Sequence, residues 1–318
     1  MGALKGITTK GIIGSFYAAL DQDLGLAWID SLSQLIESDQ EKETYKWLGQ
    51  VPQMRKKHGG KQAKELNVSD YTITNEEYEA TLKIDKADRR RDKTGQILVR
   101  VRELATRVKA HWWKLLADLI IAGETDLCYD GQAFFDTDHS EGDSGTQKNL
   151  LTATEVTQLD VTTATAPTPD EMSKAILGVI AYMQNYKDDQ GEYLNENAQQ
   201  FTVITGANSI GLAAKQAIKD KRLDTGSGSR DNLLITDEFS VTSLMSPRFA
   251  DWTTKFAVVR TDSPAKAFIR QNEVDVEMTA LAEGSEYEFH NSAHLFSAEA
   301  CRNAGYGFWQ YASKSTLS

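Results

Sequence analysis

The chain has 318 residues, 40% hydrophobic and 25% charged, a composition typical of a globular protein with one large domain or two intertwined lobes. Its 46 acidic residues outnumber its 35 basic residues, which gives a formal net charge of −11. This balance argues against a protein that grips a phosphate backbone over its whole surface, because such binding needs clustered Lys and Arg. The two cysteines, Cys128 and Cys301, lack CxxC spacing, which excludes a disulfide framework, a zinc ribbon and a thioredoxin-type site.

The N-terminal residues carry no pattern for secretion or lipid attachment. No cationic segment leads into an apolar core there, and Gly6 stands where a myristoylation motif needs Ser or Thr. The longest strongly apolar stretch, residues 115–122, is far too short to span a bilayer and contains Asp118. We therefore expect a protein that stays out of membranes and keeps both thiols reduced.

The first part of the chain changes from helical to β-like character. Residues 11–37 repeat apolar side chains at helical spacing and predict one helix, preceded by a mobile arm. Residues 45–49 and 71–74 are rich in aromatic and branched side chains, and 78–84 alternates like a further strand.

A basic, glycine-containing segment separates the first two strand-like runs, and this predicts a long projecting hairpin. The side chains at its tip are Met54, Arg55, Lys56, Lys57, His58 and Lys61. A projecting hairpin buries little of its own surface, so it needs a partner to be ordered. This feature already points to assembly.

The strongest helical pattern covers residues 94–122. Ile97, Val101, Leu104 and Val108 begin a single apolar stripe that continues to Leu119, and Gly123 stands where a helix would stop. At 1.5 Å per residue this helix is roughly 40 Å long. A single helix of that length is typical of a rigid spine.

The second half mixes loops, helices and strands. Residues 124–169 are rich in loop formers, with 138–145 the most flexible part, and Thr168 before Pro169 is typical of a helix N-cap. The predicted elements that follow are helices at 169–186 and 210–223, a flexible loop at 225–231, and strands at 201–205, 256–260, 267–270, 274–278 and 306–310. Together they indicate an α+β fold rather than a doubly wound sheet.

Two patterns resemble catalytic motifs, and each lacks a required residue. Gly206 and Gly211 have the spacing of a phosphate-binding loop, but Leu212 and Ala213 occupy the Lys and Ser/Thr positions. His290 and His294 have zinc-ligand spacing, yet Asn291 replaces the Glu that a zinc hydrolase needs. We expect a helix start at the glycines, and surface or core histidines.

An acidic loop offers oxygen ligands to a cation. In the run from Asp136 to Asp143, Gly142 comes one position too late for a calcium-binding EF-hand loop. A solvated acidic loop is therefore favoured over a metal site. The alternative from another class is a metal-dependent enzyme that uses Asp136, Asp138 and His139, and metal analysis of the purified protein distinguishes the two.

Charge is distributed unevenly along the chain. Residues 86–114 are basic and 273–288 are acidic. These segments are either two solvated faces or complementary stripes that meet between neighbouring copies of the chain. The residues predicted for such pairing are Arg89, Arg90, Arg91, Glu283, Glu286 and Glu288.

Three segments resemble the Mu-like phage major head subunit (gpT) family, in matching order and spacing over nearly the whole chain. They are Tyr45-Lys-Trp-Leu-Gly-Gln-Val-Pro with Tyr71-Thr-Ile-Thr-Asn, Leu127-Cys-Tyr-Asp-Gly-Gln-Ala-Phe-Phe-Asp-Thr-Asp-His139, and Asn303-Ala-Gly-Tyr-Gly-Phe-Trp-Gln-Tyr311. The resemblance implies a Hong Kong 97-type phage capsid fold. Its parts would be an N-terminal arm at 1–43, an E-loop at 44–85, a peripheral (P) domain at 86–169 with the spine helix 94–122, an axial (A) domain at 170–265, and a return to the P domain at 266–318.

The resemblance implies a major capsid protein with no catalytic site and no cofactor. It would assemble with itself into hexamers and pentamers of an icosahedral shell around double-stranded DNA, which it would contact without sequence specificity. The scaffold and the maturation protease would be separate proteins, and a portal would complete the shell. The alternative within the same class is the shell of a gene-transfer particle or an encapsulin-like compartment, which only the cargo distinguishes.

Overall fold

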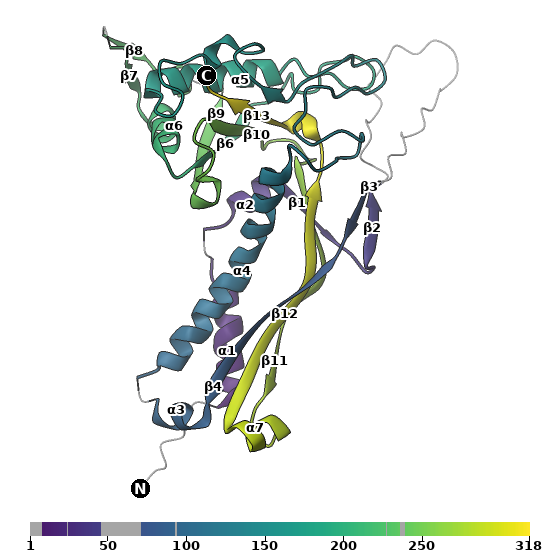
Figure 1. Cartoon of the computed structure of the whole chain (residues 1–318), viewed down its shortest axis with the longest axis vertical. Helices are drawn as coiled ribbons and strands as arrows, with labels where there is room; N and C mark the ends of the chain where they lie inside the picture. Colours follow the sequence, from purple (N-terminus) through teal and green to yellow (C-terminus); the bar gives the residue numbers. More distant parts are fainter. Residues whose placement is uncertain (1–7, 24, 46–70, 93, 227, 236–238) are drawn as a thin grey trace.

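The computed structural model describes residues 8–23, 25–45, 71–92, 94–226, 228–235 and 239–318. Figure 1 shows a broad head, which contains the C-terminus, above a long and narrow stalk. Among the described helices, none has the length and apolar character needed to cross a membrane.

The stalk consists of two helices packed on one face of a sheet (Figure 1). Its sheet has the order β1-β11-β12-β4, with β1 (Ser33–Glu37) parallel to β11 (Phe268–Leu281). Antiparallel pairing joins β11 to β12 (Ala293–Tyr306) and β12 to β4 (Glu76–Asp85). Helix α4 (Gln96–Ala122) runs along this sheet beside α1 (Thr9–Leu20), and the apolar side chains between the layers include Ile12, Phe16, Val101, Ala105 and Phe296.

Two irregularities interrupt the long β11–β12 ladder. The register shifts between Asn272 and Val274, and again between Val274 and Glu277. Each shift adds one residue to β11 relative to β12, as a β-bulge does. The pairing of β1 with β11 ends at Asn272, where the first irregularity begins.

The head is built on a second sheet with the order β5-β13-β10-β6-β9. Its strands are β5 (Leu150–Leu151), β6 (Gln200–Gly206), β9 (Ser240–Ser246), β10 (Lys255–Arg260) and β13 (Ala312–Thr316). Helices α5 (Pro169–Met183) and α6 (Ser209–Lys219) pack against it, and its β6 strand is almost entirely buried. One hydrophobic core runs from this sheet to Leu116, Ala117 and Ile120 of α4, so the head and the stalk share a core.

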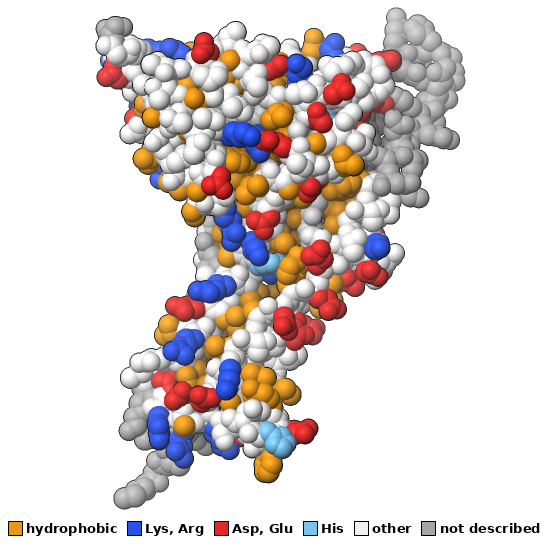
Figure 2. Space-filling model, in the orientation of Figure 1, with side chains coloured by type: hydrophobic (Ala, Val, Ile, Leu, Met, Phe, Trp, Pro, Cys, Tyr) orange, Lys and Arg blue, Asp and Glu red, His pale blue; other side chains and the backbone are white. Residues whose placement is uncertain are grey.

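Smaller elements complete the chain. They are the helices α2 (Trp28–Leu32), α3 (Lys86–Arg91) and α7 (Glu286–Asn291), the 3-10 turns η1 (Thr157–Leu159), η2 (Pro247–Phe249) and η3 (Trp309–Tyr311), and the strand pairs β2 (Lys42–Tyr45) with β3 (Tyr71–Thr74) and β7 (Arg222–Asp224) with β8 (Ser229–Asp231). Figure 1 shows β2 and β3 at the side of the stalk, where Tyr45 and Ile73 are buried in the main hydrophobic core. Figure 2 shows basic side chains along the stalk where α4 lies and acidic ones where the strands lie.

The predicted spine helix, the strand at 201–205 and the N-cap at Thr168 are confirmed. The Thr168 side chain accepts a hydrogen bond from Glu171 N, and the Glu171 side chain bonds back to the cap, which forms a complete capping box. The prediction of one continuous helix at 11–37 is wrong. Helix α1 ends at Leu20, Gly25 adopts a left-handed φ of 67°, the short helix α2 covers Trp28–Leu32, and residues 33–37 form strand β1.

The strand predictions near the C-terminus need correction. The predicted strands at 267–270 and 274–278 form one strand, β11, which begins at Phe268. Of the predicted strand at 306–310, Tyr306 ends β12, and the 3-10 turn η3 begins at Trp309. Trp309 in this turn is fully buried. The aromatic residues at 306–310 suggested a strand, but they are explained by burial in the core rather than by strand pairing. The alternating residues that form β12, before Tyr306, were missed.

The glycines with phosphate-loop spacing have a packing role. A Cβ at Gly211, in the first turn of α6, would overlap the carbonyl oxygen of Gly206. A Cβ at Gly206 would overlap the carbonyl oxygen of Phe249. The expected helix start is confirmed, since Asn208 caps α6 by accepting from Gly211 N at 3.2 Å.

These contacts predict opposite outcomes for two helical glycines. Gly211→Ala should lower the free energy of unfolding by about 1–3 kcal/mol, because backbone cannot move aside as a flexible side chain does. Gly14→Ala, in α1, meets nothing within 4 Å and should raise the free energy by up to about 1 kcal/mol through helix propensity. Urea unfolding of both variants measures the difference, and equal effects would contradict the close approach at Gly211.

Candidate functional site

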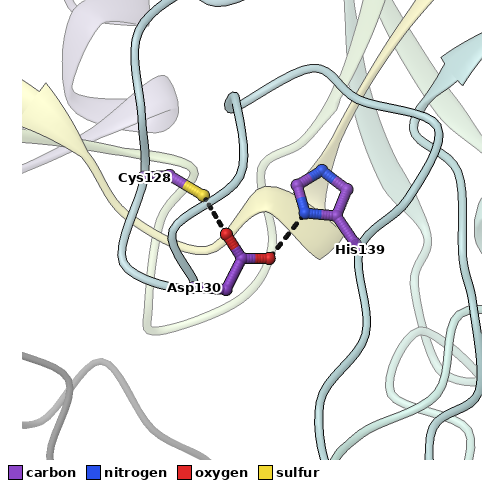
Figure 3. A group of neighbouring side chains, drawn as sticks. All are labelled: Cys128, Asp130 and His139. Atoms are coloured by element: carbon purple, nitrogen blue, oxygen red, sulfur yellow. Dashed lines mark hydrogen bonds and ion pairs between the residues drawn. The ribbon is translucent and has the colours of Figure 1, made fainter.

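A buried polar cluster lies in the loop between α4 and β5 (Figure 3). The Cys128 thiol donates a hydrogen bond to Asp130 Oδ1 at 2.9 Å, and Asp130 Oδ2 lies 2.6 Å from His139 Nδ1. The His139 and Asp130 side chains are 0% and 4% exposed. Burial raises the pKa of Asp130, but the hydrogen bonds from His139 and Cys128 outweigh it, so the pKa of this carboxyl lies below its ordinary value.

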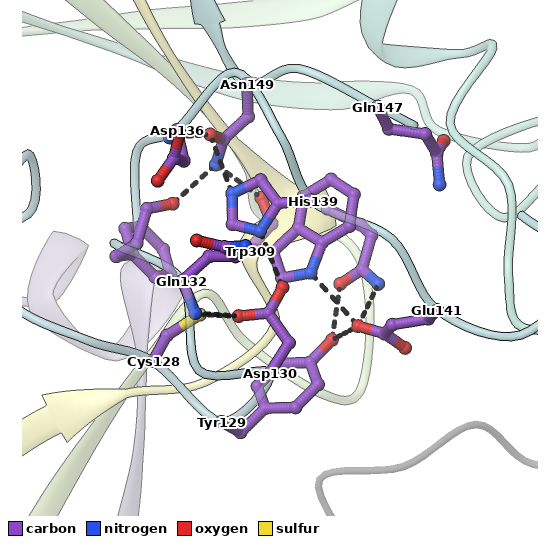
Figure 4. A network of polar contacts seen from close by, with 12 residues as sticks. Cys128, Tyr129, Asp130, Gln132, Asp136, His139, Glu141, Gln147, Asn149 and Trp309 are labelled. Atoms are coloured by element: carbon purple, nitrogen blue, oxygen red, sulfur yellow. Dashed lines mark hydrogen bonds and ion pairs between the residues drawn. The ribbon is translucent and has the colours of Figure 1, made fainter. Parts of the chain in front are cut away.

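His139 connects this loop to the C-terminal segment (Figure 4). Its ring stacks on Trp309 with a centroid distance of 4.0 Å and an interplanar angle of 7°. Its Nε2 lies 3.2 Å from Asn149 Oδ1, while Asn149 Nδ2 donates to the carbonyl oxygens of Phe134 at 2.7 Å and Ala312 at 3.2 Å. Three separate stretches of chain therefore meet at one fully buried asparagine.

Glu141 is the second centre of the network. Its Oε1 accepts hydrogen bonds from Tyr129 OH at 2.6 Å, Trp309 Nε1 at 3.1 Å and Gln310 Nε2 at 3.4 Å. Burial raises the pKa of Glu141 above its ordinary value, against the opposing effect of the hydrogen bonds from Tyr129 and Trp309. Burial is also the main cause of the raised pKa of Tyr129, and the Glu141 carboxylate raises it further.

The order of these groups does not suit nucleophilic catalysis. A thiol nucleophile needs a base in contact with it, but Asp130 lies between Cys128 and His139. Burial, followed by the charge of Asp130, raises the pKa of the Cys128 thiol, whereas reactive cysteines have lowered values. The arrangement is that of a hydrogen-bonded structural support.

Among the described residues, Cys128, Asp130 and His139 form a group that could hold a metal ion. Their possible ligand atoms all lie within 4.8 Å of one another. A structural zinc site has four ligands and deprotonated thiolates. Here the group supplies three atoms, its thiol has a raised pKa, and its carboxylate already accepts hydrogen bonds from both partners. The residues fit a hydrogen-bonded cluster better than a metal centre.

The acidic-loop expectations are partly wrong. His139 groups with Cys128 and Asp130, not with Asp136 and Asp138, so the proposed enzyme ligand set is not assembled. Asp138 is exposed, but His139 is fully buried and Glu141 is mostly buried, so the loop is not simply solvated. The residues that sequence reasoning missed are Asp130, Asn149 and Trp309, and a signal was present because Asp130 and Trp309 lie in the family-like segments.

The two histidines four residues apart do not share a face. The short helix α7 ends before Ser292, which has a left-handed φ of 48°, and His294 lies on β12. His290 is exposed and His294 is buried, with its Nδ1 2.7 Å from Arg89 Nη1. Surface or core histidines were expected, and the structure shows that His290 is a surface and His294 a core histidine.

The predicted assembly residues divide into two groups. Residues 54–61 at the hairpin tip lie outside the described residues, although the base of the hairpin is confirmed by the pairing of β2 with β3, from Lys42 with Thr74 to Tyr45 with Tyr71. Of the charged set, Arg89 pairs with Glu283 of the same chain at 2.5 Å, and Glu288 pairs with Lys86 at 2.7 Å. Contact of these residues with a neighbouring copy stays a prediction.

Comparison with known proteins places the chain in a family. The family described as Mu-like prophage major head subunit gpT matches residues 8–168 and 234–318, which is well over half of the chain. The chain belongs to this family. It is 30% identical over 127 residues to the Mu-like prophage FluMu major head subunit of Haemophilus influenzae, and 28% identical over 110 residues to the major capsid protein of Escherichia phage Mu. These matches cover 39% and 35% of this chain, and 41% and 36% of the relatives.

Solved structures show the fold. The chain is similar to a subunit of the procapsid of bacteriophage JBD30, with a TM-score of 0.55 and 20% identity over 96% of this chain and 73% of that one. A virus-like particle from Pyrococcus furiosus gives a TM-score of 0.54 at 7% identity, covering 96% of this chain and 98% of that one. The expected Hong Kong 97-type capsid fold, of the α+β class, is confirmed.

The raised pKa of Glu141 predicts a pH effect. The folded pKa lies above the ordinary 4.5, so the folded state binds more protons and stability is lost as the pH rises through this range. Glu141→Gln keeps an acceptor oxygen and removes the titration. Its free energy of unfolding should therefore increase relative to that of the wild type as the pH rises above 4.5, as measured by urea unfolding.

Glu171→Gln is the matched control with the opposite sign. The pKa of Glu171 is lowered to about 2: burial would raise it, but hydrogen bonds from Thr162 and Thr168 outweigh that effect. The stability that this carboxylate contributes is therefore present above pH 4.5 and lost as the pH falls towards 2. Parallel pH profiles for Glu141→Gln and the wild type would contradict the assignment at Glu141.

The hydrogen-bonded cluster also predicts independence from metals. Dialysis against a chelator should leave the Tm unchanged, because no step in the packing of Cys128, Asp130 and His139 needs an ion. Asp130→Ala should cost about 1–3 kcal/mol, since it leaves a buried thiol and imidazole without their acceptor. A Tm that falls after chelation and recovers with zinc would show that the cluster is a metal site.

Proposed function

We propose that this chain is the major capsid subunit of a Mu-like tailed phage or prophage, and that many copies form an icosahedral shell around double-stranded DNA. The observation that carries this proposal is the family match across both ends of the chain, joined to a capsid fold. The family and the fold are those of structural proteins. The matches to the curated relatives span about two fifths of the length of those proteins.

The shape of the subunit supports a shell-building role. The stalk is long and only two layers thick, and the β2–β3 pair lies at its side (Figure 1). Such a body leaves much of its sheet unpacked within one chain, as the exposed β4 residues show. Contacts with neighbouring copies would cover these surfaces, which a monomeric enzyme has no reason to leave open.

We assign the parts of the capsid fold as follows. The arm is 1–43, the E-loop is 44–85, the P domain is 86–169 with α4 as its spine, and the A domain is 170–265. The head sheet supports the A-domain assignment, and the β11–β12 hairpin supports the return to the P domain after residue 266. Because β13 pairs with β10 in the head sheet, we place the last residues, from Ala312, with the A domain.

Further components follow from the proposal. The subunits would be arranged as hexamers and pentamers, with a separate scaffold, maturation protease and portal, and the shell would be assembled in the bacterial cytoplasm. Contact with DNA would be non-specific and weak, because a chain with a net charge of −11 repels phosphates over most of its surface. The capsid of a native GTA particle shares the fold, with a TM-score of 0.53 at 10% identity, so cargo analysis is the test of a packaged phage genome.

Electron microscopy of the protein, expressed with and without its neighbouring scaffold gene, tests the proposal. Closed shells, tubes, or rings of five or six are expected in at least one condition. Deletion of residues 52–62, at the tip of the proposed E-loop, should leave the subunit folded and prevent closed shells.

Replacement of residues 52–62 with an equal length of Gly and Ser is the control for chain length. Loss of shells in both variants would assign the effect to the tip residues themselves. Normal shells from the deletion would overturn the E-loop assignment. A monodisperse monomer or dimer of the wild type in both conditions would overturn the capsid proposal.

A further inference from the structure

The outward face of the stalk sheet carries three glutamates side by side. Glu277 of β11 is paired in register with Glu299 of β12, and Glu299 with Glu79 of β4. All three are exposed, while the residues next to them, Met278 and Ala298, are buried against the helices. The carboxylates therefore lie on the side of the sheet that faces away from α4.

This arrangement costs stability within one subunit. Like charges directly opposite one another on neighbouring strands repel, and neighbouring strands are only about 4.8 Å apart. A groove of about 400 Å³ runs over the same place, lined by Glu77, Glu79, Glu277, Glu299 and Cys301 among others. A concave acidic surface that is unfavourable in the free subunit fits a cationic partner.

The exposed side of α4 carries the complementary charge. Arg100, Arg107 and Lys114 are exposed and recur every seven residues, so they form one stripe with a spacing of about 10.5 Å. Figure 2 shows basic side chains along the α4 side of the stalk and acidic ones along the strand side. Because the sheet lies between the two surfaces, they do not neutralise each other within one subunit.

Two complementary surfaces that face different directions on one body favour head-to-tail contact. In such a contact each subunit offers its helix to one neighbour and its sheet to the other, which closes a ring if the rotation is right. We propose that the basic stripe of α4 docks on the row formed by Glu79, Glu277 and Glu299 of a second copy. This inference rests on the proposed shell function and names the surfaces through which neighbouring stalks meet.

Some of the charged residues predicted for assembly form ion pairs within one chain. Arg89 and Glu283 at the end of the stalk are paired with each other, as are Lys86 and Glu288. The row formed by Glu79, Glu277 and Glu299 lies nearer the head, within the β11–β12 ladder and the adjoining strand β4. The charge complementarity predicted from the sequence would thus act through residues nearer the centre of the stalk.

Charge reversal on each surface tests the proposal. Glu79→Lys with Glu299→Lys, and separately Arg107→Glu with Lys114→Glu, should each lower the yield of shells roughly tenfold or more, because like charges would meet at every subunit contact. The four substitutions combined should restore assembly, since the charges are exchanged and again complementary. The shells are counted by electron microscopy and sedimentation.

The isolated subunit gives an independent reading. Glu299→Lys replaces the middle carboxylate of the row, so the Tm of unassembled protein should rise while its shell yield falls. A merely structural role would lower both. Glu196→Lys with Asp251→Lys changes two exposed charges in the head by the same amount and should assemble like the wild type.

The other outcomes distinguish the proposed contact, the partner surface and the proposed capsid function from one another. Normal shells from both reversed pairs would overturn the proposed contact and leave the capsid function intact. Loss of shells only in the Glu79 and Glu299 variant, without rescue by the combined variant, would overturn α4 as the partner and indicate the basic segment 54–61 of a second copy. Failure of the wild type to assemble would instead count against the proposed function.

Discussion

The packing of α4 against the stalk sheet is the constraint on which the other parts depend. One end of this 27-residue helix packs with α1 and the sheet through Val101 and Ala105, and the other end enters the head core through Leu116 and Ile120. Because a single helix belongs to both cores, the head cannot rotate on the stalk without breaking side-chain packing in one of them. The direction of every exposed stalk surface is thereby fixed relative to the head.

Much of the architecture could be predicted where one physical signal was strong. The apolar stripe of α4 and the N-cap at Thr168 are local patterns, and both were predicted. Residues 11–37 misled because their apolar spacing suits a helix, whereas the backbone of residues 33–37 pairs with β11, more than 230 residues later. A strand chosen by so distant a partner leaves little trace in its own sequence.

The candidate site shows the same limit. The sequence offered Asp136 and Asp138 beside His139 as an alternative metal site, less favoured than a solvated acidic loop. The fold instead gives His139 the neighbours Asp130, Asn149 and Trp309. Two family-like segments that had no catalytic logic, around residues 127–139 and 303–311, are joined by this contact. Their unusual residues are explained by each other, which periodicity within either segment could not reveal.

The two extra residues in β11 have a mechanical consequence. Residues 268–272 of β11 lie between β1 and β12. Among the described strands, the part of β11 after Glu277 pairs with β12 alone. A bulged strand bends and twists more than its neighbour, so deformation concentrates between these two positions. The bend of the stalk sheet is therefore set between these two positions. The angle at which the far part of the stalk leaves the head depends on two extra residues in one strand.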